Sequence, residues 1–262
     1  MSTFNDQSSA LIGHTGFVGG NLATAANWSD LYNSKNIREL ATATFDRVIC
    51  AGVSAVKWQA NRDPAADWAA IVPLLDALST LKAREFTLIS TVDVYPNPVL
   101  VQELDCPELD KCHAYGRHRL QIEQFVRQRF PDALIVRLPG MFGPGLKKNA
   151  IYDLLHNNQI QAIDPAARFQ FYDVRWLWAD LQVARNTGLK LVNFSTQPLG
   201  MGEVAQRVFN RALPDRDGPH GLYDFRSNHA ALWGRNDGYL YGKDQVLAAL
   251  QQWVTTVPHG DR

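Results

Sequence analysis

Three glycines near the start of the chain have the spacing of a phosphate-binding turn. Gly13, Gly16 and Gly19 lie in the segment G-H-T-G-F-V-G, after the apolar run Ser9–Gly13 and at the start of a helical pattern over Phe17–Asn27. The first glycine permits a tight turn, the second lets the backbone approach a pyrophosphate, and the third lets the helix pack close to its strand. The pattern predicts a dinucleotide site; a glycine-rich turn without a ligand is the alternative.

The rest of this turn and the end of the next strand extend the predicted cofactor site. Helix N-termini bind phosphate through their N–H groups and positive dipole, so Phe17 and Val18 are included, and Thr15 adds a hydroxyl donor. An acidic residue about twenty positions further on would bind the ribose of NAD, but the chain has Asn33-Ser34-Lys35 there. These residues could hold a 2′-phosphate, which favours NADP over NAD; a solvated loop lysine is the alternative. The predicted cofactor contacts also include Asn33, Ser34, Lys35, Ala51, Gly52, Val53, Tyr115 and Pro139.

Alternating strand and helix patterns would position these residues. Short apolar runs that indicate buried strands occur at 9–13, 30–34, 47–52, 85–91, 133–138 and 190–196. Helical spacing occurs at 17–27, 63–82, 114–130, 150–158, 176–187, 202–210 and 245–254, and 214–223 has the composition of a loop. Such alternation is typical of an α/β protein with a Rossmann-type doubly wound parallel sheet. Ligands should bind beyond the carboxyl ends of the strands, where Gly13, Gly52, Thr91 and Pro139 converge.

The composition excludes several classes of protein. The chain has 262 residues, with Lys+Arg and Asp+Glu balanced at 26 each, so nothing favours broad capture of nucleic acid or of a membrane surface. Three cysteines give no disulfide framework and no metal spacing, so no metal is predicted. No secretory signal or membrane-spanning run is visible, and we expect a cytoplasmic protein.

With these motifs in order, the chain resembles the extended branch of the short-chain dehydrogenase/reductase superfamily, the NAD-dependent epimerase/dehydratase family that acts on nucleotide sugars. The likeness covers most of the chain. It rests on the glycine segment, V-I-C-A-G at 48–52, L-I-S-T-V-D-V-Y at 88–95, Y-G-R-H-R at 115–119 and R-L-P-G-M-F-G-P-G at 137–145. The last motif is specific for the extended branch.

The resemblance implies a set of catalytic residues. Thr91 matches the family's hydroxyl residue, Tyr115 its catalytic tyrosine, and Arg119 occupies the position of its lysine. Residues four apart share a helix face, so a cation at 119 would stabilise the phenolate and lower its pKa. Arginine is bulkier than lysine and does not release a proton near neutral pH. A family asparagine is also replaced, by Ile71.

The resemblance also implies a division of the chain. Residues 1–145 would form the dinucleotide-binding domain, joined by a segment returning near 169–196, and 146–168 and 197–262 would form a small substrate-binding annex. Trp58, Asp93, Lys148 and Asn149 are the predicted substrate contacts. For the basic turn at 147–149 a purely solvated role is the alternative. The helix with Tyr115 could pair with its copy in a homodimer.

Three hypotheses of function remain from the sequence. The first is an enzyme that oxidises and reduces a nucleotide-linked sugar, as an epimerase, a dehydratase or a reductase. The second is a protein that binds NADP with little turnover, as a redox sensor or scaffold, which the residues at 71 and 119 favour. The third, less favoured because of the long C-terminal annex, is a reductase of a small carbonyl compound.

Overall fold

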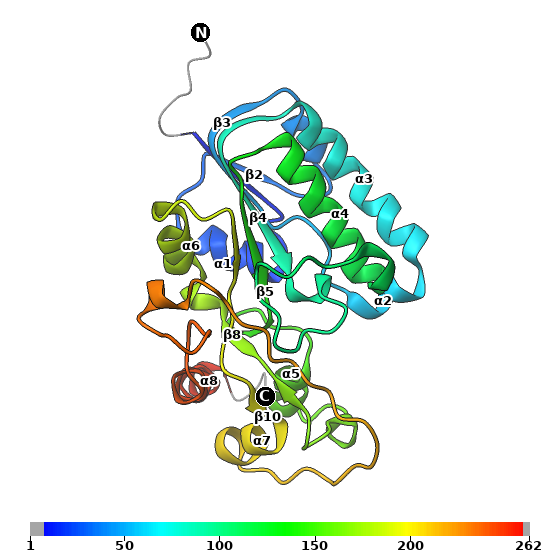
Figure 1. Cartoon of the computed structure of the whole chain (residues 1–262), viewed down its shortest axis with the longest axis vertical. Coiled ribbons are helices and arrows are strands. Elements are labelled where there is room, and N and C mark those ends of the chain that lie inside the picture. Colours follow the sequence, from blue (N-terminus) through cyan, green and yellow to red (C-terminus); the bar gives the residue numbers. More distant parts are fainter. Residues whose placement is uncertain (1–7, 259–262) are drawn as a thin grey trace. The chain divides into compact units, whose positions relative to one another are not determined.

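The structure, a computed structural model, describes residues 8–258 (Figure 1). Two compact units divide the chain. The first holds Met1–Pro96, Cys106–Arg137 and Leu177–Val192, and the second holds Asn97–Asp105, Leu138–Trp176 and Asn193–Arg262.

The first unit is built on a six-stranded sheet with the order β2-β1-β3-β4-β5-β9. The pairs β1–β2, β1–β3 and β3–β4 are parallel. From β1, the chain adds β2 on one side and then β3 on the other, which makes the β1–β3 edge the switch point where such sheets bind ligands. The strands are β1 (Ser9–Ile12), β2 (Asp30–Tyr32), β3 (Thr44–Cys50), β4 (Lys82–Thr91), β5 (Leu134–Leu138) and β9 (Leu191–Asn193).

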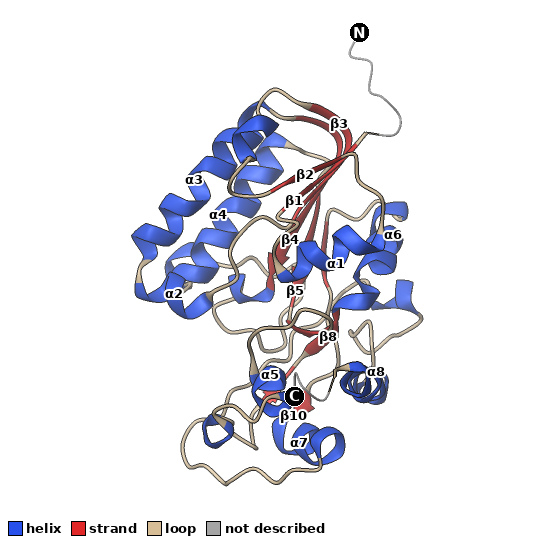
Figure 2. Ribbon diagram, turned by 180° about the vertical axis from the view of Figure 1, so that it is seen from behind, coloured by secondary structure: helices blue, strands red, loops and turns tan. Residues whose placement is uncertain are grey.

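Helices cover both faces of this sheet. Helices α1 and α6 lie on one face, and α2, α3 and α4 pack together on the other (Figure 2). The helices are α1 (Phe17–Ala25), α2 (Lys57–Arg62), α3 (Pro64–Thr80), α4 (Ala114–Arg129) and α6 (Leu177–Asn186), with 3-10 turns η1 (Ile37–Leu40), η2 (Val92–Val94) and η3 (Leu109–Lys111). Strands buried on both faces explain the continuous apolar runs that mark them in the sequence.

Local sequence fixes the start of the two long helices. Pro64 occupies the first turn of α3, where its missing N–H costs nothing, and Asp63 caps that helix by accepting a hydrogen bond from Ala66 N at 3.0 Å. His113 caps α4, because its Nδ1 accepts from Gly116 N at 3.1 Å. The cap of α4 therefore stands two residues before Tyr115.

The second unit has its own apolar core, in which α7 and α8 pack against short strands and α5. Two small sheets, β6–β8 (parallel) and β7–β10 (antiparallel), run through it. Its elements are β6 (Gly140–Phe142), α5 (Ala150–Leu155), η4 (Ile160–Ala162), β7 (Arg168–Phe169), β8 (Phe171–Asp173), η5 (Val174–Trp176), β10 (Leu199–Gly200), α7 (Met201–Phe209), η6 (Ala230–Trp233) and α8 (Lys243–Thr256).

The predicted Rossmann-type fold is confirmed, including the late strand that returns to the main sheet as β9. The strand predicted over 47–52 is wrong at its C-terminal end, because β3 stops at Cys50 and Ala51 and Gly52 lie outside it. The short polar helix α2 and the four short strands β6, β7, β8 and β10 were not predicted. Within residues 8–258, no helix combines the length and the apolar character needed to cross a membrane.

Candidate functional site

The glycine turn connects β1 to α1, and its glycines have different physical roles. Gly13 has a φ of +87°, and a Cβ there would fall 2.4 Å from the Ala51 carbonyl oxygen. A Cβ on Gly19 would fall 2.0 Å from the Gly13 carbonyl oxygen. A Cβ on Gly16 would meet only that same oxygen, at 3.4 Å, so the space outside Gly16 is open. Gly13 and Gly19 are therefore required by the fold, whereas Gly16 leaves room for a ligand.

The N-terminus of α1 is suited to an anion. Gly16 is exposed and is the N-cap, and among the described residues no side chain caps this helix. The N–H groups of a first helical turn need an acceptor from outside the helix, and a phosphate supplies it. Thr15, which is exposed, directly precedes the N-cap. Phe17 and Val18 are the first two residues of α1.

The loop after β2 meets the glycine turn. Gly13 N donates to the Tyr32 carbonyl at 2.7 Å, and the side chains of Asn33 and His14 lie 3.1 Å apart, Nδ2 to Nε2. Asn33 Oδ1 also accepts from Lys35 N at 2.8 Å, which shapes the loop and leaves Lys35 exposed. The structure thus brings the two predicted cofactor segments together, through a histidine that the sequence analysis did not single out.

A chain of contacts runs from the glycine turn to Tyr115. Ala51 and Gly52 abut Gly13 at the β1–β3 switch point. Two residues on, the Ser54 carbonyl accepts a hydrogen bond from Arg119 Nη2, and Arg119 lies over the ring of Tyr115. These contacts therefore link the predicted catalytic residues of α4 to the predicted cofactor residues at the carboxyl ends of β1 and β3.

Tyr115 is buried, 7% exposed, in the first turn of α4. Thr91, at the end of β4, lies near enough for its side chain to lower the pKa of the phenol. Burial raises the pKa of Tyr115 above its usual value, while the Arg119 charge, the Thr91 side chain and the Lys57 charge oppose the rise and the Asp93 charge adds to it. The pKa of the tyrosine therefore depends on several groups around it.

Arg119 is held by partners that lie far away in the sequence. Its guanidinium donates Nη1 and Nη2 to the two carboxylate oxygens of Asp67 on α3, the second at 3.1 Å. His118 Nδ1 lies 2.7 Å from Asp67 Oδ2. The Arg119 Cζ lies 4.0 Å from the centre of the Tyr115 ring, and within the described chain its buried Nε has no hydrogen-bond partner. The arginine therefore stacks on the ring face with its charge balanced by a carboxylate.

Asp67 remains ionised in this cluster. Burial raises its pKa, but the hydrogen bonds and charges of Arg119 and His118 outweigh burial, so the pKa lies below its usual value. The sequence offered no signal for this residue, because an aspartate in the first turn of a helix is commonly solvated and favoured by the helix dipole.

A second buried ion pair joins α4 to the central strands. Glu123, with no exposed surface, accepts hydrogen bonds from Arg137 at 3.0 and 2.7 Å and from the Ser90 hydroxyl at 2.6 Å. Arg137 also donates to the Tyr95 hydroxyl at 2.7 Å. Since Ser90 precedes Thr91 and Glu123 is on the helix of Tyr115, this network fixes the helix against the strand that carries the hydroxyl.

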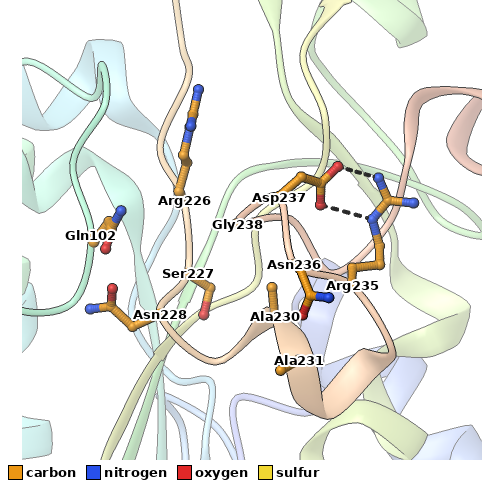
Figure 3. A pocket seen from close by; sticks show the side chains of 10 residues that line it. All are labelled: Gln102, Arg226, Ser227, Asn228, Ala230, Ala231, Arg235, Asn236, Asp237 and Gly238. Atoms are coloured by element: carbon orange, nitrogen blue, oxygen red, sulfur yellow. Dashed lines mark hydrogen bonds and ion pairs between the residues drawn. The ribbon is translucent and has the colours of Figure 1, made fainter.

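Two pockets lie within the second unit. One, of about 330 Å³, is lined by apolar side chains such as Ile163 and Phe169 and by the charged side chains of Asp153, Asp164, Asp217 and Arg216. The other, of about 360 Å³, is lined mainly by polar side chains. Figure 3 shows Arg235 and Asp237 of this pocket joined by a salt bridge.

The remaining predicted residues have the following environments. Trp58 on α2 is 64% exposed, and Asp93 in η2 forms an ion pair with Lys57 at 2.7 Å. Asn149 caps α5, since its Oδ1 accepts from Ile151 N and Tyr152 N. Lys148 is exposed. Pro139 directly follows β5 and belongs to the second unit. Val53 packs against the core of the first unit.

A family model described as the NAD dependent epimerase/dehydratase family matches residues 25–164. The chain belongs to this family. No curated protein shows significant similarity to the chain.

Three solved structures that are similar to this family member contain bound ligands. RMD from Pseudomonas aeruginosa, complexed with NADPH, has 22% identity and a TM-score of 0.73, over 96% of this chain and 100% of that one. The dTDP-4-dehydrorhamnose reductase of Bacillus anthracis, with NADP, has 15% identity and a TM-score of 0.74, over 98% and 100%. The UDP-glucose 4-epimerase of Thermotoga maritima, with UDP-glucose, has 14% identity and a TM-score of 0.68, over 95% and 98%.

Proposed function

We propose that this family member is an NAD(P)-dependent enzyme that oxidises or reduces a nucleotide-linked sugar. The observation that carries the proposal is the buried Tyr115, with the Thr91 side chain near its phenol and the Arg119 guanidinium over its ring. A buried phenol that a hydroxyl and a cation both influence is equipped to exchange a proton with a substrate oxygen. The family and the similar structures support the same chemistry.

The dinucleotide would bind at the glycine turn of the first unit. The uncapped N-terminus of α1 and the open space at Gly16 fit a diphosphate. The loop 33–36 contains no carboxylate to repel a 2′-phosphate, and exposed Lys35 supplies a positive charge. We therefore propose NADP as the preferred cofactor. Replacing Lys35 with Glu should weaken NADPH binding about tenfold, the effect of losing one exposed charge-assisted contact, and leave NADH binding unchanged.

The proposed chemistry divides between the cofactor and the protein. The nicotinamide would supply the hydride acceptor or donor. In the direction of reduction, the Tyr115 Oη–H donates its proton to the carbonyl oxygen of the substrate while the Thr91 Oγ1 hydrogen bonds that oxygen; in oxidation Tyr115 receives the proton. Epimerase, dehydratase and reductase all use this exchange, and a dehydratase would further need an acid such as Asp93, which is paired with Lys57.

The second unit would bind the substrate, and we assign the nucleoside to the pocket at Phe169. Small-molecule sites need apolar surface beside a few polar groups, and the pocket at Phe169 has more apolar surface than the polar pocket at Arg235. Arg216, which donates to the Ala162 carbonyl at 2.6 Å, provides a cation there, and the pocket begins at Ala150, directly after the basic turn with Lys148. Arg216→Ala should raise KM for the substrate about tenfold, and Arg235→Ala, as the matched control, should leave KM unchanged.

The central test combines binding and turnover. Fluorescence titration with NADPH and NADH measures cofactor affinity, and a panel of nucleotide sugars, with 4-keto forms included, measures turnover. Tyr115→Phe should retain NADPH binding and lose turnover by a factor of about 100 or more, the contribution of a general acid. Undiminished turnover in this variant would reject the role of Tyr115.

A second candidate function is NADP binding without efficient turnover, as a sensor or scaffold. The commitment of Arg119 to Asp67 and to the Ser54 carbonyl favours it, because a guanidinium held this way has few donors left for a cofactor or substrate. NADPH binding with no turnover across the panel would support this function. Arg119→Lys then distinguishes an impaired enzyme, which gains activity, from a binding protein, which does not.

A further inference from the structure

Arg119 is one of several charges that act on the proposed catalytic tyrosine. The family places a lysine ammonium four residues after the tyrosine, whereas here a guanidinium lies over the ring face, 4% exposed, with Asp67 as its counter-ion. A guanidinium over the ring favours the phenolate, and other charges near the phenol add to this effect or oppose it. The charge at the phenol therefore depends on what else lies near it.

Helix α2 is anchored beside Tyr115 by its last turn. Asn61 Oδ1 accepts a hydrogen bond from Tyr115 N at 2.9 Å. Lys57 precedes Asn61 by four residues and therefore lies one turn away on the same face of α2. The contact through Asn61 thus directs the Lys57 face of this helix toward the start of α4.

The turn η2 approaches the same point from the other side. A Cβ on Gly116 would fall 2.0 Å from the Asp93 carbonyl oxygen, so only glycine at this position lets η2 pack on α4. Lys57 Nζ and Asp93 Oδ1 are 2.7 Å apart, and the side chain of Asp93 is 18% exposed. The contacts at Asn61 and Gly116 therefore hold the two elements that carry this ion pair, α2 and η2, against residues 115 and 116 in the first turn of α4.

We propose that Lys57 is a positioning residue for the Tyr115 phenol: held by Asp93, it brings from α2 a second positive charge that adds to the charge of Arg119. This inference rests on the proposed function, because it assigns Lys57 an effect on the proton that Tyr115 exchanges. Lys57 acts through the tyrosine and is assigned no contact with the substrate.

The electrostatics of two neighbouring groups agree with this placement. The charges near the Tyr115 phenol come from Arg119 on α4, Lys57 on α2 and Asp93 in η2, and the two cations favour the phenolate while Asp93 disfavours it. His113, whose ring lies 6.2 Å from that of Tyr115, has a pKa lowered by burial first and by the Lys57 charge second, while Asp93 raises it. Both rings at the start of α4 therefore respond to the same ion pair.

The test is a direct titration of residue 115 in the whole chain without cofactor. Site-specific incorporation of 3,5-difluorotyrosine at 115 gives a single ¹⁹F signal, and fluorination lowers the phenol pKa into a range where lysines stay protonated. Lys57→Met should raise this pKa by about 1, and Asp93→Asn should lower it by a similar amount. Lys57→Arg should restore the original value, which a merely structural role would not require.

Lys190 provides the matched control. It too is a lysine paired with an aspartate, Asp132, at 2.8 Å, and Lys190→Met should leave the pKa of residue 115 unchanged. Equal titrations in Lys57→Met and Lys190→Met, with Asp93→Asn also unchanged, would overturn the proposal. Turnover is measured separately with NADPH and the nucleotide-sugar panel. If the wild-type chain turns over none of them, the proposed function fails, whereas the titration still decides whether Lys57 acts on Tyr115.

Discussion

Replacing Gly16 with alanine should separate cofactor binding from folding. Gly16 has φ −79° and ψ 171°, a backbone conformation that alanine adopts readily. The added methyl group would meet only the Gly13 carbonyl oxygen, at 3.4 Å, which is close to ordinary van der Waals contact. The fold should therefore accept the change, and the methyl group would occupy the space that a diphosphate needs.

The expected magnitudes follow from these contacts. A phosphate displaced from the first turn of α1 would lose about two charge-assisted hydrogen bonds of roughly 1.5 kcal/mol each. The sum, about 3 kcal/mol, corresponds to an increase of about 100-fold in the Kd for NADPH. At the N-cap, the change from glycine to alanine should alter the free energy of unfolding by no more than about 1 kcal/mol.

Two other glycines of the same segment are the controls. Gly20 lies within α1, and a Cβ there would fall 3.6 Å from the His14 carbonyl oxygen, so Gly20→Ala should leave NADPH binding unchanged. Gly19→Ala would place its Cβ 2.0 Å from the Gly13 carbonyl oxygen and should destabilise the protein itself. NADPH fluorescence titration and denaturant unfolding measure the two effects. An unchanged Kd in Gly16→Ala would refute the assignment of this turn to the diphosphate.

Three further predictions concern pH dependence, the buried ion pair and thiol reactivity. The pKa of His113 is lowered by burial and then by a nearby cation, so the unfolded chain binds a proton first and stability falls as the pH drops below about 6.5. His113→Asn keeps a cap on Gly116 without titrating, and its unfolding free energy should lack this part of the acid loss. Glu123→Gln leaves the buried charge of Arg137 uncompensated and should cost about 3 to 5 kcal/mol in denaturant unfolding. Of the three cysteines, exposed Cys106 alone should react with iodoacetamide under native conditions, because the other two thiols are buried; intact-mass analysis showing a second modification would contradict this.

The comparison of motifs in the sequence already identified Arg119 as the main departure at the proposed site, but it did not predict the effect of this arginine. The sequence predicts that Arg119 shares a helix face with Tyr115, and the structure places its guanidinium on that ring. The effect of the arginine depends on Asp67, which lies 52 residues earlier in the chain and forms an ion pair with it. Any effect of Arg119 on turnover is therefore an effect of the Arg119–Asp67 ion pair and not of the arginine alone.

The sequence by itself determined the α/β fold, the order of its main strands and helices, and the glycine turn between β1 and α1. These features follow from local rules, since strands buried on both faces need apolar runs, amphipathic helices need a regular spacing, and a tight turn with close helix packing needs glycines at Gly13 and Gly19. The tertiary structure alone decided how the charges around Tyr115 are paired. Polar α2 has no apolar period to reveal it, and ion pairs such as Lys57–Asp93 join elements whose separation in the sequence carries no pattern.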